Sequence, residues 1–115
     1  MFGEQIRTIE RVLDNLEEGR LFRAAASLAD RHASDAMGSI SGGKSGQLRR
    51  GWTKGHAAAM AAVRHASSSH LRAQKFYQGK DAKKAAYHDT QVRKHAYSFN
   101  QLDQHQTRTA EDPKA

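Results

Sequence analysis

Two long stretches in the second half of the chain repeat small, apolar or histidine side chains in steps of three or four residues. They cover residues 52–77 and residues 82–102. Such steps place side chains along one stripe of an α-helix, and two stripes of this kind pack together as a seam. We therefore expect two helices whose seams face each other. The first seam is Trp52, His56, Ala59, Val63, Ala66, His70, Ala73 and Tyr77, and the second is Ala82, Ala85, His88, Val92, His95, Phe99 and Leu102.

The two seams can be placed in register around Gly79. In an antiparallel hairpin, facing residues have numbers with a constant sum, and pairing His70 with His88 gives twice 79. Glycine at a helix end readily adopts a positive φ, and Asp81 is a good N-cap for the second helix. The sequence therefore predicts a long antiparallel helical hairpin over residues 47–104 that bends at Gly79.

The N-terminal segment has its own apolar repeat, in steps of four and three residues. Gly19 interrupts the helical pattern, which then continues to Met37. We therefore expect a short helical pair over residues 1–37, in preference to the alternative of one longer helix broken at Gly19. The apolar positions before the glycine are Phe2, Ile6, Ile9, Leu13 and Leu16.

Residues 38–46 are rich in Gly and Ser, which predicts a loop between the two helical halves. Residues 105–115 are polar and contain the only proline, Pro113, which predicts a disordered tail. The expected fold class is therefore all-α, with the whole chain forming one compact domain.

Composition excludes several classes of protein and of functional site. The chain has 115 residues, no cysteine and 37% hydrophobic residues. Disulfides and thiolate sites are excluded, and no apolar run reaches the length of a membrane span. The first residues lack the pattern of a signal peptide. We expect an intracellular, cytoplasmic protein, located in the host cell if it is encoded by a phage.

The positive charge is concentrated in one segment. Residues 41–84 contain ten Lys or Arg and one acid, Asp81, so this segment carries a net charge of +9. An exposed helix usually mixes acids with bases, and residues 41–80 contain no acid. The candidate binding residues are Lys44, Arg49, Arg50, Lys54, Arg64, Arg72, Lys75, Lys80, Lys83 and Lys84.

Two partners fit such a segment. The first is nucleic acid, bound through its phosphates without sequence specificity. The second is an acidic protein surface, with the chain acting as an interaction or assembly factor, such as a phage or plasmid accessory protein, a virion component or a host-enzyme inhibitor. In that role the N-terminal helices would supply a seam for a partner or a homodimer. The sequence predicts no membrane partner.

Residues Gly38–Ser45 match the Walker A pattern literally. A phosphate-binding loop of that type follows a buried β-strand, whereas residues 29–37 have a helical pattern. We therefore expect no nucleotide hydrolysis here. A role in binding a single anion stays open, with Lys44 and the glycine amides as its ligands.

Seven histidines raise the question of a metal site. His70 and His88 are the weak candidates, because the register places them opposite each other. No histidine spacing supplies a carboxylate to complete the coordination. We expect the seam histidines to fill space and to hydrogen-bond, with no metal and no cofactor. The sequence offers no paired carboxylates and no nucleophile with its base, so we expect no enzyme.

Overall fold

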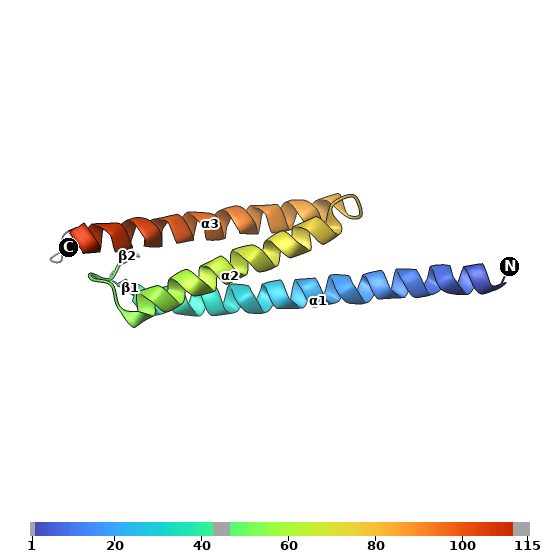
Figure 1. Cartoon of the computed structure of the whole chain (residues 1–115), viewed down its shortest axis with the longest axis horizontal. Coiled ribbons are helices and arrows are strands. Elements are labelled where there is room, and N and C mark those ends of the chain that lie inside the picture. The colour runs from blue at the N-terminus through green and yellow to red at the C-terminus, as the bar shows by residue number, and fades with distance from the viewer. Residues whose placement is uncertain (1, 43–46, 112–115) are drawn as a thin grey trace.

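The computed structural model describes residues 2–42 and 47–111, and it confirms the all-α class. Figure 1 shows α2 between α1 and α3, in an elongated molecule of 73 × 24 × 20 Å. Among the described residues, none of the helices combines the length and the apolar content that crossing a membrane requires. The elements are α1 (Phe2–Ile40), β1 (Ser41–Gly42), β2 (Gln47–Leu48), α2 (Lys54–Tyr77) and α3 (Ala82–Glu111).

The expected helical pair over residues 1–37 is wrong, because α1 is one continuous helix. Glycine inside a helix costs about 1 kcal/mol relative to alanine, which does not end a helix that packs against neighbours. Gly19 instead allows a close approach. The Tyr77 hydroxyl donates a hydrogen bond to the Gly19 carbonyl (3.1 Å). A Cβ at Gly19 would lie 2.9 Å from that hydroxyl oxygen.

Two glycines of α1 should therefore respond differently to substitution by alanine. Gly38 has no atom within 4 Å of a built Cβ, so Gly38→Ala should stabilise the fold by about 0.5–1 kcal/mol through helix propensity. Gly19→Ala should give no such gain, because the new methyl group displaces the Tyr77 side chain. Thermal unfolding of both variants measures the difference. Equal stabilisation by the two substitutions would contradict the packing role of Gly19.

The segment before α2 is not helical, so the predicted start of the hairpin at residue 47 is wrong. β1 and β2 pair antiparallel, with Ser41 opposite Leu48. Gly51 has φ +83°, which turns the chain before the helix begins. Thr53 then caps α2 in a capping box with His56, whose Nδ1 accepts from the Thr53 backbone N–H (3.2 Å). The histidine Nε2 hydrogen-bonds to the Arg49 carbonyl (2.9 Å) and holds this connector against the helix.

The turn between α2 and α3 contains Gly79, with φ +81°. The backbone N–H groups of Lys80 and Asp81 both donate to the Tyr77 carbonyl (2.8 and 2.9 Å). The Asp81 carboxylate accepts from the Lys84 N–H (3.1 Å) and so caps α3. These bonds satisfy some of the backbone groups that the two helix ends leave free.

The core lies on the first seam, where every member within α2 is buried. Ala59, Ala66 and Ala73 have no exposed surface, and Leu102 of α3 is also fully buried. Seam residues of α3 such as Val92 and Phe99 are only half-buried. The difference follows from position, because α2 has a neighbouring helix on both sides and α3 has one (Figure 1).

The loop and the tail also differ from the expectation. Gly38–Ile40 belongs to α1 and Ser41–Gly42 forms β1, whereas residues 43–46 lie outside the described part. Residues 105–111 continue α3 instead of forming a disordered tail, and residues 112–115 are not described. His105 explains this extension, because its Nε2 hydrogen-bonds to the Gly51 carbonyl (2.9 Å) and its ring stacks on His56 (5.1 Å).

Candidate functional site

Basic side chains of residues 49–84 reach solvent along the hairpin. All nine candidate residues that the structure describes are exposed, whereas Lys44 lies outside the described residues. Lys84 pairs with Asp81 at 3.9 Å, and Lys80 lies over the Phe76 ring (3.9 Å to the ring centroid). Among the side chains that the structure describes, those of residues 19–42 and 47–111, the other eight find no ion-pair partner. Their charge is therefore available to a partner.

Four of these residues share one side of α2. Lys54 and Arg72 are five full turns apart, and Arg64 and Lys75 lie within about 80° of them at 100° per residue. This side is opposite the buried seam. We call these four residues the cationic face. It is extended by residues outside α2, which are Arg49 and Arg50 in the connector, Lys80 in the turn, and Lys83 and Lys84 in the first turn of α3. Arg50 was expected on the helix, and its position before Thr53 corrects that expectation.

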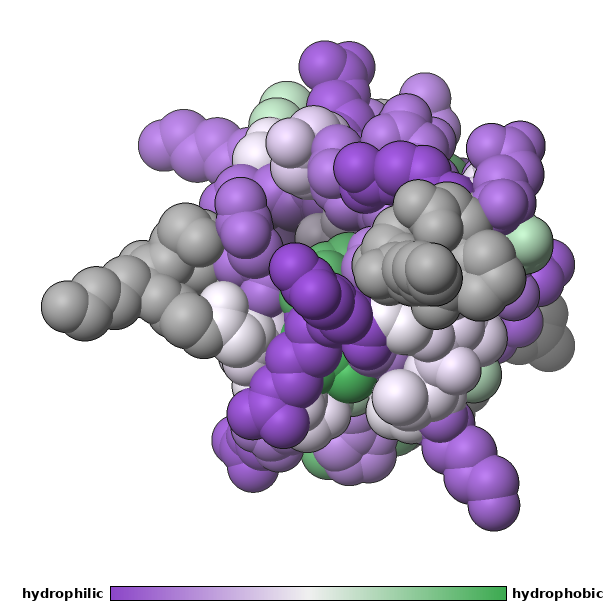
Figure 2. Space-filling model, turned by 90° about the vertical axis from the view of Figure 1, so that its left-hand side faces the viewer, coloured by the Kyte–Doolittle hydropathy of each residue, from purple (hydrophilic) through white to green (hydrophobic). Residues whose placement is uncertain are grey.

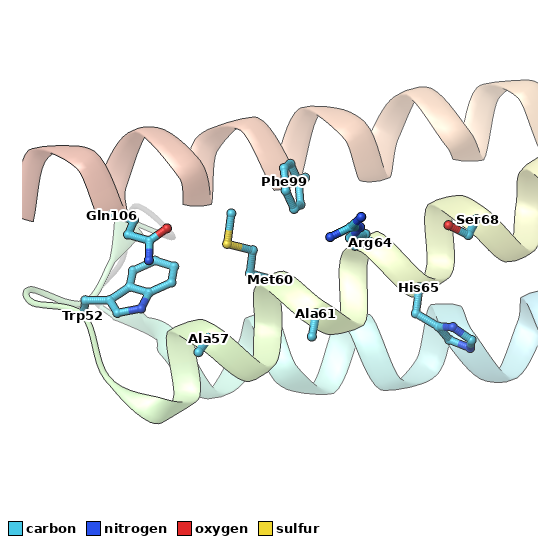
Figure 3. A pocket seen from close by; sticks show the side chains of 9 residues that line it. All are labelled: Trp52, Ala57, Met60, Ala61, Arg64, His65, Ser68, Phe99 and Gln106. Atoms are coloured by element: carbon cyan, nitrogen blue, oxygen red, sulfur yellow. The ribbon is translucent and has the colours of Figure 1, made fainter.

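A shallow groove of about 540 Å³ runs beside the cationic face, between α2 and α3. Figure 3 shows Arg64 and Ser68 along α2, with the Phe99 ring projecting from α3 above them. The side chains that α2 contributes to the groove include several short ones, which would let an extended ligand approach the helix. The lining residues are Trp52, Ala57, Met60, Ala61, Arg64, His65, Ser68, Phe99 and Gln106.

The end of the molecule that carries β1 and β2 is also mainly hydrophilic. Figure 2 views this end, where long hydrophilic side chains surround a small hydrophobic area. Arg49, Arg50 and Lys54 belong to this region of the chain, next to the paired strands. The cationic face therefore continues into a polar end.

A second cluster lies inside the bundle and contains residues from all three helices. Asp30 of α1 accepts hydrogen bonds at one carboxylate oxygen, Oδ1, from His70 of α2 (2.7 Å) and His95 of α3 (2.6 Å). The His70 side chain is 1% exposed, His95 14% and Asp30 30%. His88 completes the cluster, because its Nδ1 lies 2.7 Å from Nδ1 of His70.

The hydrogen bonds define where the protons of this cluster lie. A carboxylate oxygen only accepts, so Nε2 of His70 and of His95 both carry a proton. Of the two Nδ1 atoms of His70 and His88, one carries a proton and donates it to the other. Burial lowers the pKa of His88 below its ordinary value of 6.5, and neighbouring His70 lowers it further, whereas Asp30 acts in the opposite direction. The His88 ring, stacked on Tyr77 (5.8 Å), is therefore neutral at neutral pH.

The sequence paired His70 with His88 but missed Asp30 and His95 as members of one site. Asp30 comes from a helix 40 residues before His70, so no local spacing could reveal it. A signal was nevertheless present. Ala29 and Ala33 are small residues four apart, as on one face of a helix, and both are buried. Asp30 directly follows Ala29, so the acid borders that face.

The Walker A match has the wrong surroundings for a phosphate-binding loop. The helix α1 precedes it, and the described residues contain β-structure only as one two-residue antiparallel pair.

Comparison of the chain with protein-family models, with curated proteins and with solved structures finds no match. Function must therefore be argued from the residues themselves.

Proposed function

We propose that the chain binds nucleic-acid phosphates, without sequence specificity, through the cationic face of α2 and the basic residues that extend it. One observation carries this proposal: a run of basic residues is exposed along one side of a helix and, apart from Lys84, forms no ion pair with the described side chains, which are those of residues 19–42 and 47–111. Residues 41–80 contain no acid that could neutralise the run. Phosphates are the usual ligands of such unpaired charges.

The neighbouring groove supports contact with a backbone rather than with bases. Ala57, Ala61 and Ser68 are short side chains beside Arg64, so a phosphate chain could approach α2 closely. Two aromatic rings of α2 and the connector before it pack on other rings. The Trp52 ring packs on His56 (5.5 Å), and Phe76 packs on Phe22 (5.2 Å). Phe99 gives the groove one ring from α3, and the exposed rings of Tyr87 and Tyr97 do not line it. One ring cannot stack a run of bases, so binding should be indifferent to sequence.

Fluorescence anisotropy with a labelled 20-base-pair duplex and a labelled single strand, from 50 to 300 mM salt, tests the proposal. Each phosphate contact contributes about 0.9 to the slope of log K against log salt on duplex DNA. The triple variant Arg64→Gln, Arg72→Gln, Lys75→Gln should therefore reduce the slope by about 2–3. The affinities of unrelated sequences should differ little.

A matched control removes the same number of charges elsewhere. Arg93→Gln, Lys94→Gln and Arg108→Gln are exposed positions of α3, outside residues 41–84. This control should keep most of the salt slope. Equal losses in both triple variants would show only an effect of net charge, and no binding at 50 mM salt would overturn the proposal. An acidic protein surface would then be the partner to seek.

A role in protein assembly is the second candidate, and the length of α1 favours it. Tyr77, the last residue of α2, lies against Gly19, and Figure 1 shows α1 continuing beyond the turn between α2 and α3. The sequence of this projecting segment has apolar residues in steps of four and three, the repeat by which helices pair. A second copy of the chain, aligned along the same segment, is the partner that this repeat fits.

A further inference from the structure

We propose that Asp30, His70 and His95 bind one zinc ion that links the three helices. The proposal is independent of phosphate binding, because these residues lie inside the bundle and not on the cationic face. One ligand atom from each residue lies within 4.8 Å of the other two. Two imidazole nitrogens and one carboxylate oxygen form a donor set typical of zinc, which takes such ligands at about 2.0–2.2 Å.

The geometry requires only a small adjustment to hold the ion. In the hydrogen-bonded form, both Nε2 atoms lie 2.6–2.7 Å from the same Asp30 oxygen. Ligand atoms around a tetrahedral zinc ion lie about 3.3 Å apart, given bonds of about 2.0 Å. The carboxylate must therefore retreat by about 0.7 Å. Asp30 can make this movement because its side chain is 30% exposed.

Zinc can take the place of the two Nε2 protons, because each histidine ring can carry a proton on its other nitrogen. Zinc takes the lone pair of Nε2 on His70 and on His95, so in the zinc-bound form each ring carries its proton on Nδ1. The Nδ1–H of His70 then donates to Nδ1 of His88, which accepts because the His88 ring carries its own proton on Nε2. An outer hydrogen bond of this kind fixes the orientation of a ligating histidine. His88 is thus a positioning residue and not a ligand.

The site has three protein ligands and one side open to solvent. His70 is deeply buried, whereas Asp30 and His95 keep part of their surface exposed. Water can supply the fourth ligand from that side, which is also the entry path for the ion. Because the ligands come from α1, α2 and α3, bound zinc would hold all three helices at one level of the bundle.

Zinc titration of the chain after treatment with EDTA tests the site. Calorimetry at pH 7.5 should show one strong site per chain, and Mg²⁺, which prefers oxygen ligands, should not bind there. Zinc at tenfold excess over its Kd should raise the Tm by about 5 °C or more. Cobalt(II) should give the visible spectrum of a four-coordinate ion. A Tm unchanged by zinc would overturn the proposal.

Variants separate this site from adventitious binding to other histidines. Asp30→Asn and His95→Gln should each weaken zinc binding by at least about tenfold, and His88→Gln by about 10–100-fold. His65→Gln, an exposed histidine outside the cluster, is the matched control and should bind zinc normally. If Asp30→Asn and His95→Gln retain the strong site, zinc binds elsewhere and the proposal is wrong. The cobalt spectrum of the unmodified chain remains decisive should a variant fail to fold.

Discussion

Leu102→Ala should lower the free energy of unfolding by about 2–5 kcal/mol, the largest loss expected from shortening one side chain. Leu102 is fully buried and belongs to the same apolar cluster as Ala33 of α1 and Val63 of α2. Removing its isobutyl group loses buried area and leaves a cavity. Neighbouring alanines are too short to fill that space. Urea unfolding followed by circular dichroism measures the change.

Leu71→Ala is the matched control, because Leu71 is 40% exposed on α2. The same truncation there should cost less than about 1 kcal/mol. Similar losses at both positions would contradict a core centred on Leu102. A loss near 5 kcal/mol at Leu102 would show that the alanine-rich helices cannot move inward to close the cavity.

Ala66→Leu should destabilise the fold by about 1–3 kcal/mol, because it adds a larger side chain where the core has no room for one. Ala66 has no exposed surface and belongs to the buried cluster. A leucine there must push the helices apart, although leucine favours helix formation almost as well as alanine. Ala58→Leu on the exposed side of α2 controls for propensity and should change stability by no more than about 0.5 kcal/mol. A stable Ala66→Leu variant would show that the helices do not pack closely at this level.

The sequence predicted the all-α class and the buried stripe of α2 well, because both depend on a repeat within one helix. Positions such as Ala59, Val63 and Ala73 are buried wherever α2 packs, whatever its neighbour is. The repeat of α3 predicted burial less well. Ala82 and Val92 follow the same steps, yet they remain exposed or half-buried because α3 lies at the edge of the bundle.

The errors came from features that depend on distant residues. Glycine often interrupts a helix, but the role of Gly19 is to let Tyr77, 58 residues later, approach α1 closely. The helical end of α3 depends on His105 reaching Gly51. The candidate zinc site depends on Asp30, which meets His70 and His95 only when α1 packs on the hairpin. Local periodicity can place a residue beside a buried face, as it does for Asp30, but it carries no information about which distant residue lies opposite.

The elongated shape of the molecule affects how its mass can be measured in solution. Its radius of gyration is 19.0 Å, compared with about 13 Å for a compact domain of 115 residues and about 17 Å for a compact chain of twice that length. A single chain should therefore leave a size-exclusion column where a compact dimer would. Elution volume would report the length of α1, whereas sedimentation equilibrium would report the number of chains.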